Sequence, residues 1–187
     1  MTRELVEETQ ESLHHVLSKG VNTMLNKKLQ DALNQQINGE LFSSYLYLAM
    51  SAHFESVNLS GFAGWMKVQS QEEGEHGMKL YHYVFERGGR VLLEAIAKPA
   101  VEYKTPLDVM KKVLEHEKKI TASIEALYEL ALKEKDYATQ VTLQWFIKEQ
   151  VEEEKNATDI IELLKSIGDN PAGLAMVDQR LGFRKKG

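Results

Sequence analysis

The chain has 187 residues, of which 27% are charged, with a net charge of −5 and no cysteine. This length suits one domain with a substantial core, and the acidic balance argues against non-specific nucleic-acid binding. The lack of cysteine excludes disulfides, thiolate-held iron–sulfur clusters and cysteine-based zinc sites. No apolar run approaches the roughly 18 residues that a membrane span needs, and the N-terminus lacks the apolar core of a signal peptide, so the cytoplasm is the expected location.

The first 23 residues are expected to be an extension of the domain that follows at residues 24–187. An apolar face at helical spacing ends at Gly20, which predicts a short amphipathic helix and then a brief linker. The residues of this face are Leu5, Val6, Thr9, Leu13, Val16 and Leu17. The extension is either a docking or assembly element or a segment with no chemical role.

Two long helices are predicted next, at about residues 24–55 and 61–87. The turn between them offers Asn58 and Ser60 as helix caps, and Gly88-Gly89 is a strong stop signal after the second helix. Two further glycines, Gly74 and Gly77, lie inside the second helix, where either close packing or a soft turn would explain them.

The second half of the chain predicts two more long helices and a short fifth one. Residues 90–104 have no helical period, and in a bundle such a segment can run the full length so that successive helices lie parallel. Thr105-Pro106 caps the third helix, Asp136 caps the fourth, and Gly168 ends it. The fifth helix covers about residues 172–181.

Each long helix carries a polar interruption near the middle of its apolar face. These interruptions are Glu40, then Glu73 with His76, then Glu117, then Gln150 with Glu153. Residues three apart on a helix are neighbours, so Glu73 and His76 form a carboxylate–imidazole pair on one turn. Four interruptions at matching depth predict one buried acidic cluster, which cannot stay charged unless a cation lies within it.

The predicted donors are carboxylate oxygens with a single imidazole, a set that suits iron(II), manganese or magnesium. Two cations bridged by Glu73 and Glu117 would balance the charge, and iron is the metal of this group that reacts readily with O2. Tyr47 and Trp145 are placed near the cluster, where each either supplies an electron or a hydrogen bond or serves as an ordinary core aromatic.

Residues 24–182 resemble the non-haem ferritins of bacteria and archaea. The stretches that carry the resemblance are 38–48 (Asn-Gly-Glu-Leu-Phe-Ser-Ser-Tyr-Leu-Tyr-Leu), 71–76 (Gln-Glu-Glu-Gly-Glu-His), 115–117 (Glu-His-Glu) and 145–153 (Trp-Phe-Ile-Lys-Glu-Gln-Val-Glu-Glu). The resemblance implies an all-α, ferritin-like four-helix bundle with one long crossover between helices two and three.

The resemblance also implies roles for individual residues and an activity. Two iron ions are implied, the first held by Glu40, Glu73 and His76, and the second by Glu73, Glu117 and Glu153, with Gln150 as a hydrogen-bonding neighbour. A third site is implied at Glu72, Glu149, Glu152 and Glu153. The family oxidises iron(II) with O2 or hydrogen peroxide and stores an iron(III) oxide mineral inside a hollow shell of 24 identical subunits, with no nucleic-acid or membrane partner.

Differences between this sequence and related families narrow the expected function. The fourth helix has Gln150 where the general di-iron pattern has a second Glu-x-x-His, which disfavours bacterioferritins and rubrerythrins. Gly74 stands where bacterioferritins have a haem-ligating Met, so no haem is expected. Gln140 and Leu143 replace the acidic channel residues of animal ferritins, which leaves the path of iron into the shell open. The alternative functions are a di-iron peroxidase of rubrerythrin type and a scaffold protein without iron turnover.

Overall fold

A computed structural model describes residues 24–184, and residues 1–23 and 185–187 lie outside this described part. The amphipathic helix expected in the N-terminal extension therefore stays a prediction.

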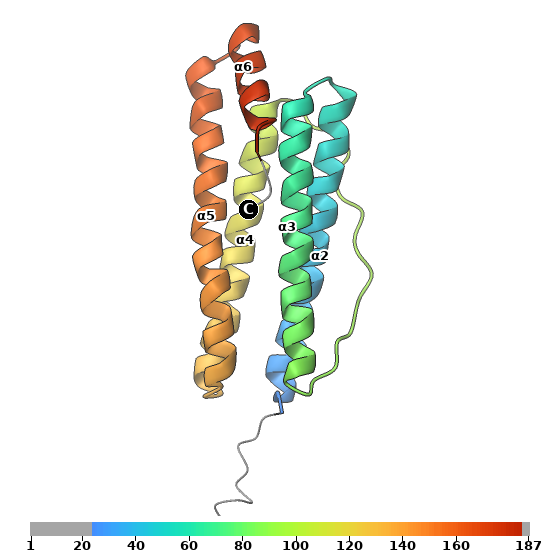
Figure 1. The fold of residues 1–187 in the computed structure, drawn as a ribbon, viewed down its shortest axis with the longest axis vertical. Coiled ribbons are helices and arrows are strands. Elements are labelled where there is room, and N and C mark those ends of the chain that lie inside the picture. Colours follow the sequence, from blue (N-terminus) through green and yellow to red (C-terminus); the bar gives the residue numbers. More distant parts are fainter. Residues whose placement is uncertain (1–23, 185–187) are drawn as a thin grey trace, which may run out of the picture.

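Five α-helices make up the described part of the chain, which contains no strand. Their bounds are α2 (Lys27–Ser56), α3 (Ser60–Glu86), α4 (Pro106–Lys133), α5 (Tyr137–Ile167) and α6 (Pro171–Leu181). The four long helices stand side by side as a bundle, and α6 folds back from the end of α5 (Figure 1). The predicted all-α four-helix bundle with a short fifth helix is confirmed.

The helix limits follow from local capping chemistry. The side chains of Thr105 and Asp136 accept hydrogen bonds from the backbone of Asp108 and Thr139, as predicted for the starts of α4 and α5. Helices α3 and α5 end just before glycines with positive φ, which are Gly88 at 65° and Gly168 at 55°.

The start of α3 differs from the prediction. Its N-cap is Leu59, which makes no side-chain hydrogen bond, so neither Asn58 nor Ser60 caps this helix. Asn58 adopts φ 60° in the turn after α2 instead. The backbone N–H of Phe62 donates to Oδ1 of Asp178 on α6, at 2.9 Å. A distant helix thus supplies the cap that the local sequence lacks.

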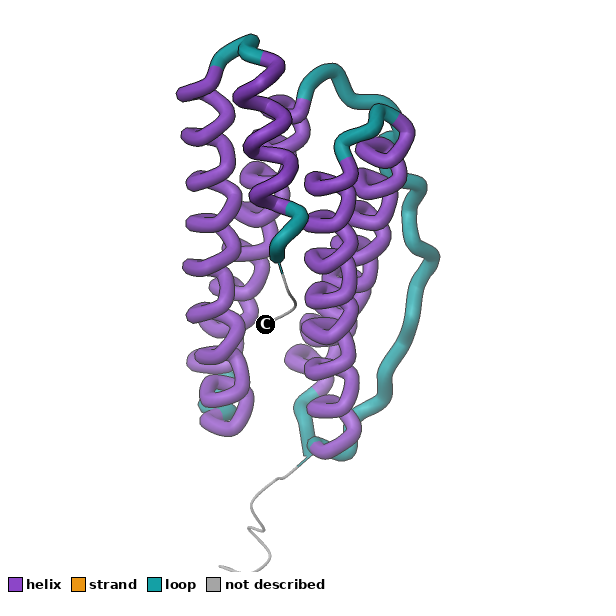
Figure 2. The backbone as a smooth tube through the Cα atoms, turned by 45° about the horizontal axis from the view of Figure 1, so that its top comes forward, coloured by secondary structure: helices purple, strands orange, loops and turns teal. Residues whose placement is uncertain are grey.

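The connection between α3 and α4 runs along the whole length of the bundle beside α2 (Figures 1 and 2). Two asparagines on α2 hold it. Asn34 exchanges hydrogen bonds with the backbone of Arg90 and Leu92, and Asn38 does so with Leu92 and Glu94, all at 2.9–3.0 Å. This crossover makes α3 and α4 parallel, as predicted.

Two hydrophobic clusters fill the bundle, one at each end. One cluster includes Phe54, Phe62, Met110, Ile161 and α6 residues Val177 and Leu181. The other includes Leu33, Leu80, Ile124, Leu143 and Phe146. On all four long helices the predicted polar interruptions fall in the sequence between the two clusters. The bundle therefore has a buried polar layer at mid-height, between two apolar halves.

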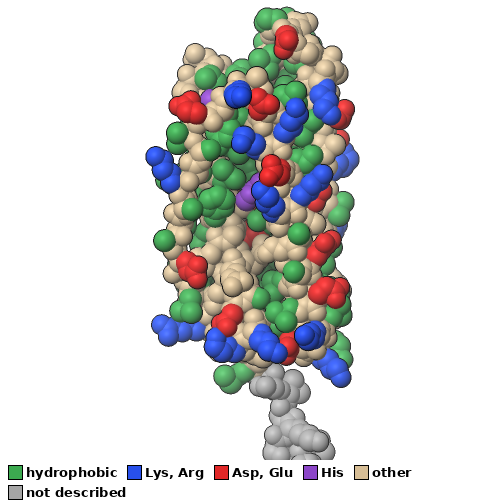
Figure 3. Space-filling view, turned by 180° about the vertical axis from the view of Figure 1, so that it is seen from behind, with side chains coloured by type: hydrophobic (Ala, Val, Ile, Leu, Met, Phe, Trp, Pro, Cys, Tyr) green, Lys and Arg blue, Asp and Glu red, His purple; other side chains and the backbone are tan. Residues whose placement is uncertain are grey.

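The outer surface carries charges of both signs. On the face seen in Figure 3, basic and acidic side chains are interspersed, and hydrophobic side chains gather between them in the upper half. None of the described helices is both long enough and apolar enough to cross a membrane.

Candidate metal centre

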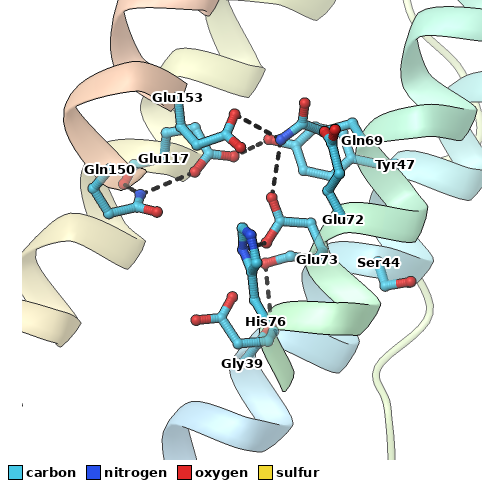
Figure 4. A network of polar contacts seen from close by, with 12 residues as sticks. Gly39, Ser44, Tyr47, Gln69, Glu72, Glu73, His76, Glu117, Gln150 and Glu153 are labelled. Atoms are coloured by element: carbon cyan, nitrogen blue, oxygen red, sulfur yellow. Dashed lines mark hydrogen bonds and ion pairs between the residues drawn. The ribbon is translucent and has the colours of Figure 1, made fainter. Parts of the chain in front are cut away.

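The polar layer brings the predicted ligands from four helices to one place (Figure 4). Their side chains are nearly sealed from solvent, since each of the five residues that carry an ionisable group has a relative exposure of 1–6%. The five are Glu40 on α2, Glu73 and His76 on α3, Glu117 on α4 and Glu153 on α5.

Glu40, Glu73 and His76 form the tightest group. One ligand atom from each lies within 4.8 Å of the others. The Nδ1 atom of His76 is 3.5 Å from Oε2 of Glu73, as expected for residues one helical turn apart. The imidazole is also held from the side by the edge-on ring of Trp145, 5.2 Å away between centroids.

Close packing of α2 against α3 sets this group. A Cβ on Gly77 would lie 3.3 Å from the Cβ of Glu40, so glycine lets the two helices approach at the level of the ligands. One turn away, Ser44 and Ser70 each donate a hydroxyl hydrogen bond to the other's backbone carbonyl, at 2.6 and 2.7 Å. Close packing therefore accounts for Gly77, whereas a Cβ on Gly74 would make only an ordinary 3.6 Å contact.

Glu117 is held by two donors from neighbouring helices. The hydroxyl of Tyr47 on α2 donates to one carboxylate oxygen. The amide of Gln150 on α5 donates to the other, at 3.1 Å. Tyr47 is fully buried, and burial with the nearby charge of Glu117 raises its pKa well above the usual value, so it stays a donor at neutral pH.

Glu153 is tied to α3 through Gln69. The side-chain NH2 of Gln69 donates to Oε2 of Glu153 at 2.7 Å and to Oε1 of Glu73 at 3.1 Å. One amide thus links carboxylates from two helices (Figure 4).

Burial and mutual repulsion make these carboxylates hold their protons. Burial first, and then the charge of Glu73, raise the pKa of Glu117 to about 7 and that of Glu153 to about 8. The same two causes raise the pKa of Glu40 well above its usual value. Burial alone would lower the pKa of His76, but its hydrogen bond to Glu73 and the charge of that carboxylate outweigh burial and raise it.

One atom in the layer shows that the residues fit a cation. Oε2 of Glu40 is buried without a hydrogen-bond partner, while Oε1 accepts from Gln36 at 2.8 Å. A buried unpaired carboxylate oxygen is costly, and a cation beside it would remove that cost. Several carboxylates with one imidazole are the hard donor set that suits iron(II), and Glu40 shares such a group with Glu73 and His76.

Of the four residues predicted for a third site, Glu153 is one of the buried residues of the layer, and the other three lie at its margin. Glu72 is ion-paired with Arg184, Glu149 is half-buried with its charge acting on His76, and Glu152 is exposed. Among the described residues, the group close enough to share one ion is Glu40, Glu73 and His76. The third-site role of Glu72, Glu149, Glu152 and Glu153 therefore stays a prediction.

The prediction from sequence gave no role to several residues that hold the ligands. Gln36 and Gln69 each lie four residues before a ligand, on the same helix face, and this spacing was the available signal. His116 forms a 2.7 Å hydrogen bond with Ser43 and packs edge-on against the ring of Tyr47. Its position next to Glu117 in the sequence did not indicate this role. Arg184 reaches Gln69 from beyond the last helix, which no local pattern could indicate.

Comparisons with known proteins agree with this geometry. The Ferritin-like domain family matches residues 30–167. The chain is 45% identical over 161 residues to the bacterial non-haem ferritin of Bacteroides fragilis, covering 86% of this chain and all of that one. It is 38% identical to the bacterial non-haem ferritin of Staphylococcus aureus over 86% of this chain and 97% of that one.

A solved structure is similar over nearly its whole length. The open pore ferritin from the hyperthermophilic archaeon Archaeoglobus fulgidus has a TM-score of 0.86 and 47% sequence identity with this chain. The likeness covers 87% of this chain and 99% of that one.

Proposed function

Because this chain belongs to the ferritin family, and to its bacterial non-haem members, we propose that it stores iron after oxidising iron(II) at the mid-bundle centre. The single observation that carries the proposal is the buried carboxylate layer, in which Oε2 of Glu40 has no hydrogen-bond partner and a cation would stabilise it. Iron(II) is the substrate and cargo of this centre.

Two iron(II) ions per chain are proposed. Glu40, Glu73 and His76 would hold the first, and Glu73, Glu117 and Glu153 the second. The support is that Glu73 lies at the middle of the layer, where its charge raises the pKa of the three other carboxylates. Two iron(II) ions supply two electrons, the number that reduces O2 to hydrogen peroxide or hydrogen peroxide to water.

The chain's own groups manage protons and orientation. A carboxylate must lose its proton to bind a cation, so Glu117 and Glu153, with pKa values of about 7 and 8, would release protons as iron(II) binds. Tyr47 and Gln150 keep one donor on each oxygen of Glu117, which limits how far that carboxylate can turn.

The proposal extends to the assembly. Ferritin relatives support a homo-oligomeric shell, and we propose 24 copies with the iron(III) mineral inside. The cytoplasmic location stays a prediction, and nothing in the described residues favours the peroxidase or scaffold alternatives.

The test is the rate of iron(II) oxidation in air, followed by the amber absorbance of iron(III). Glu73→Gln removes the central charge at nearly constant volume and should slow the reaction at least about tenfold. Glu129→Gln, at an exposed position on α4, is the control and should leave the rate unchanged. Equal rates for the wild-type protein and Glu73→Gln, with both assembled, would remove the basis of the site assignment.

A further inference from the structure

Helix α6 is docked so that Arg184, three residues beyond its end, reaches the side of the polar layer at Gln69. Val177 and Leu181 are buried in the hydrophobic cluster that includes Phe54 and Phe62. Asp178 caps the start of α3 through the N–H of Phe62. At this crossing a Cβ on Gly61 would lie 1.7 Å from the carbonyl oxygen of Asp178, so only glycine permits the approach. The position of the segment after α6 is therefore fixed relative to α3.

That segment places the guanidinium of Arg184 against α3. It donates to Oε1 of Gln69 at 2.7 Å and pairs with Oε2 of Glu72 at 2.5 Å. It also lies over the ring of Trp65, 4.5 Å from its centroid. The side chains of Arg184 and Glu72 are only 19% and 17% exposed, so this ion pair is partly shielded from water.

The contact with Gln69 reaches two predicted ligands. Because the amide oxygen of Gln69 accepts from Arg184, its NH2 group faces Glu73 and Glu153. The reversed amide would place its oxygen against both carboxylates and its NH2 against the guanidinium. Arg184 thus fixes the orientation of the amide that joins α3 to α5 in the polar layer.

We propose that Arg184 is a positioning residue that competes with divalent cations for the Glu72 side of the centre, an inference that rests on the proposed function. Glu72 directly precedes Glu73, and its carboxylate is ion-paired with the guanidinium. A divalent cation bound to Glu72 would lie a few ångströms from the positively charged guanidinium of Arg184 in a partly buried site. Their repulsion there is strongly unfavourable. A cation that takes Glu72 as a ligand must therefore displace Arg184.

The first test uses Zn²⁺, which does not change oxidation state, titrated calorimetrically into the assembled full-length protein. Arg184→Gln removes the competing charge, so a cation no longer has to displace a charged hydrogen bond from Glu72. Zn²⁺ affinity should therefore be about threefold to tenfold higher. Arg184→Lys keeps the charge and should stay close to the wild-type affinity. Arg180→Gln removes the same charge from an exposed position on α6 and is the matched control.

The second readout is the fluorescence of Trp65, which lies under the guanidinium. The chain has two tryptophans, so the measurement is made in a Trp145→Phe background. Saturating Zn²⁺ should change the Trp65 emission when Arg184 is present, and the change should be lost in Arg184→Gln. An arginine with a purely structural role would stay over the ring, and the emission would not respond.

The outcomes separate this inference from the proposed function. If Glu73→Gln abolishes Zn²⁺ binding but Arg184→Gln and Arg180→Gln bind equally well, the competition inference is wrong and the centre stands. If Glu73→Gln binds Zn²⁺ as the wild-type protein does, the proposed centre itself is wrong.

Discussion

At the scale of single residues, the centre concentrates four carboxylates where water cannot screen them. Glu117 and Glu153 respond by holding protons near neutral pH, with pKa values of about 7 and 8, and Glu40 shifts in the same direction. A carboxyl whose pKa is higher in the folded than in the unfolded chain stabilises the fold while it is protonated. Its contribution is complete below the unfolded pKa and is lost as the pH rises through the folded one.

The direction of this pKa shift predicts how the stability of the metal-free protein depends on pH. Between about pH 4.5 and pH 8 the contribution of Glu153 to the free energy of unfolding should fall, since its pKa rises from 4.5 to about 8 on folding. Glu153→Gln mimics the protonated form, so its Tm should match the wild-type Tm near pH 5 and exceed it above pH 8. Chelator-treated samples would be compared by calorimetry, with Glu129→Gln as control. A Tm difference that is constant with pH would contradict the assigned shift.

A second prediction concerns Gln36, which joins Glu40 to α4. Its amide donates to Glu40 at 2.8 Å, and its oxygen accepts from Ser123 at 2.6 Å. Gln36→Leu leaves both oxygens of Glu40 without a donor and should weaken Zn²⁺ binding about tenfold, a size typical of residues that orient ligands. Ser123→Ala leaves the Gln36–Glu40 bond in place, so it should have a much smaller effect. Calorimetric titration measures both, and equal losses would show that Gln36 does not act on Glu40.

The residues that sequence reasoning identified are those that interrupt an apolar helix face. Glu40, Glu73 and Glu117 could be found because a carboxylate at a core position stands out at helical spacing. Gln36 and Gln69 lie on the same faces, but an amide there has no single meaning until its partner on another helix is known.

At the scale of helices, glycines set how closely the elements approach. Gly77 brings α3 against Glu40 on α2, and Gly61 brings α3 against α6. Gly64, on the same helix, has no atom within 4 Å of an added Cβ. Gly61 and Gly77 are thus required for close packing of the helices. Gly64 has no such role, so it only lowers the stability of the helix.

Substituting alanine at two of these positions should give opposite results. Gly64→Ala should raise the free energy of unfolding by about 0.5–1 kcal/mol, because glycine is unfavourable inside a helix. Gly61→Ala should lower it by about 1–3 kcal/mol, because the new methyl group collides with the backbone of α6. Urea unfolding monitored by circular dichroism measures both changes. Stabilisation by both substitutions would show that α6 is not docked on α3 at Gly61.

The ends of the helices were largely predictable because caps are local. Thr105 and Asp136 each bond a backbone N–H three residues on, within the reach of a sequence pattern. The start of α3 was not predictable, because its cap, Asp178, lies 116 residues from Phe62 along the chain. The path of residues 90–104 was predicted from the length of this segment, but its attachment to Asn34 and Asn38 was not.

At the scale of the whole molecule, the match to the ferritin family begins after the expected N-terminal extension. The family match covers residues 30–167, and a relative matched over its entire length aligns with 161 residues of this chain. The parts needed for the bundle and its polar layer therefore lie within the segment shared with ferritins.

Removal of residues 1–23 should leave the assembly intact. Light scattering should give a particle of 24 subunits for the full 21.3 kDa chain and for the chain that begins at Met24. A ferritin relative that is matched over its entire length aligns with only 161 residues of this chain, which supports this result. Dissociation of the shortened chain into dimers or monomers would assign the extension a structural role in the shell.

The most direct test of the centre is anomalous X-ray diffraction at the iron edge from crystals soaked anaerobically with iron(II). We expect two peaks in the polar layer of each chain, one contacting Glu40, Glu73 and His76 and the other contacting Glu73, Glu117 and Glu153. Iron bound only outside this layer, with the five side chains still in place, would contradict this expectation.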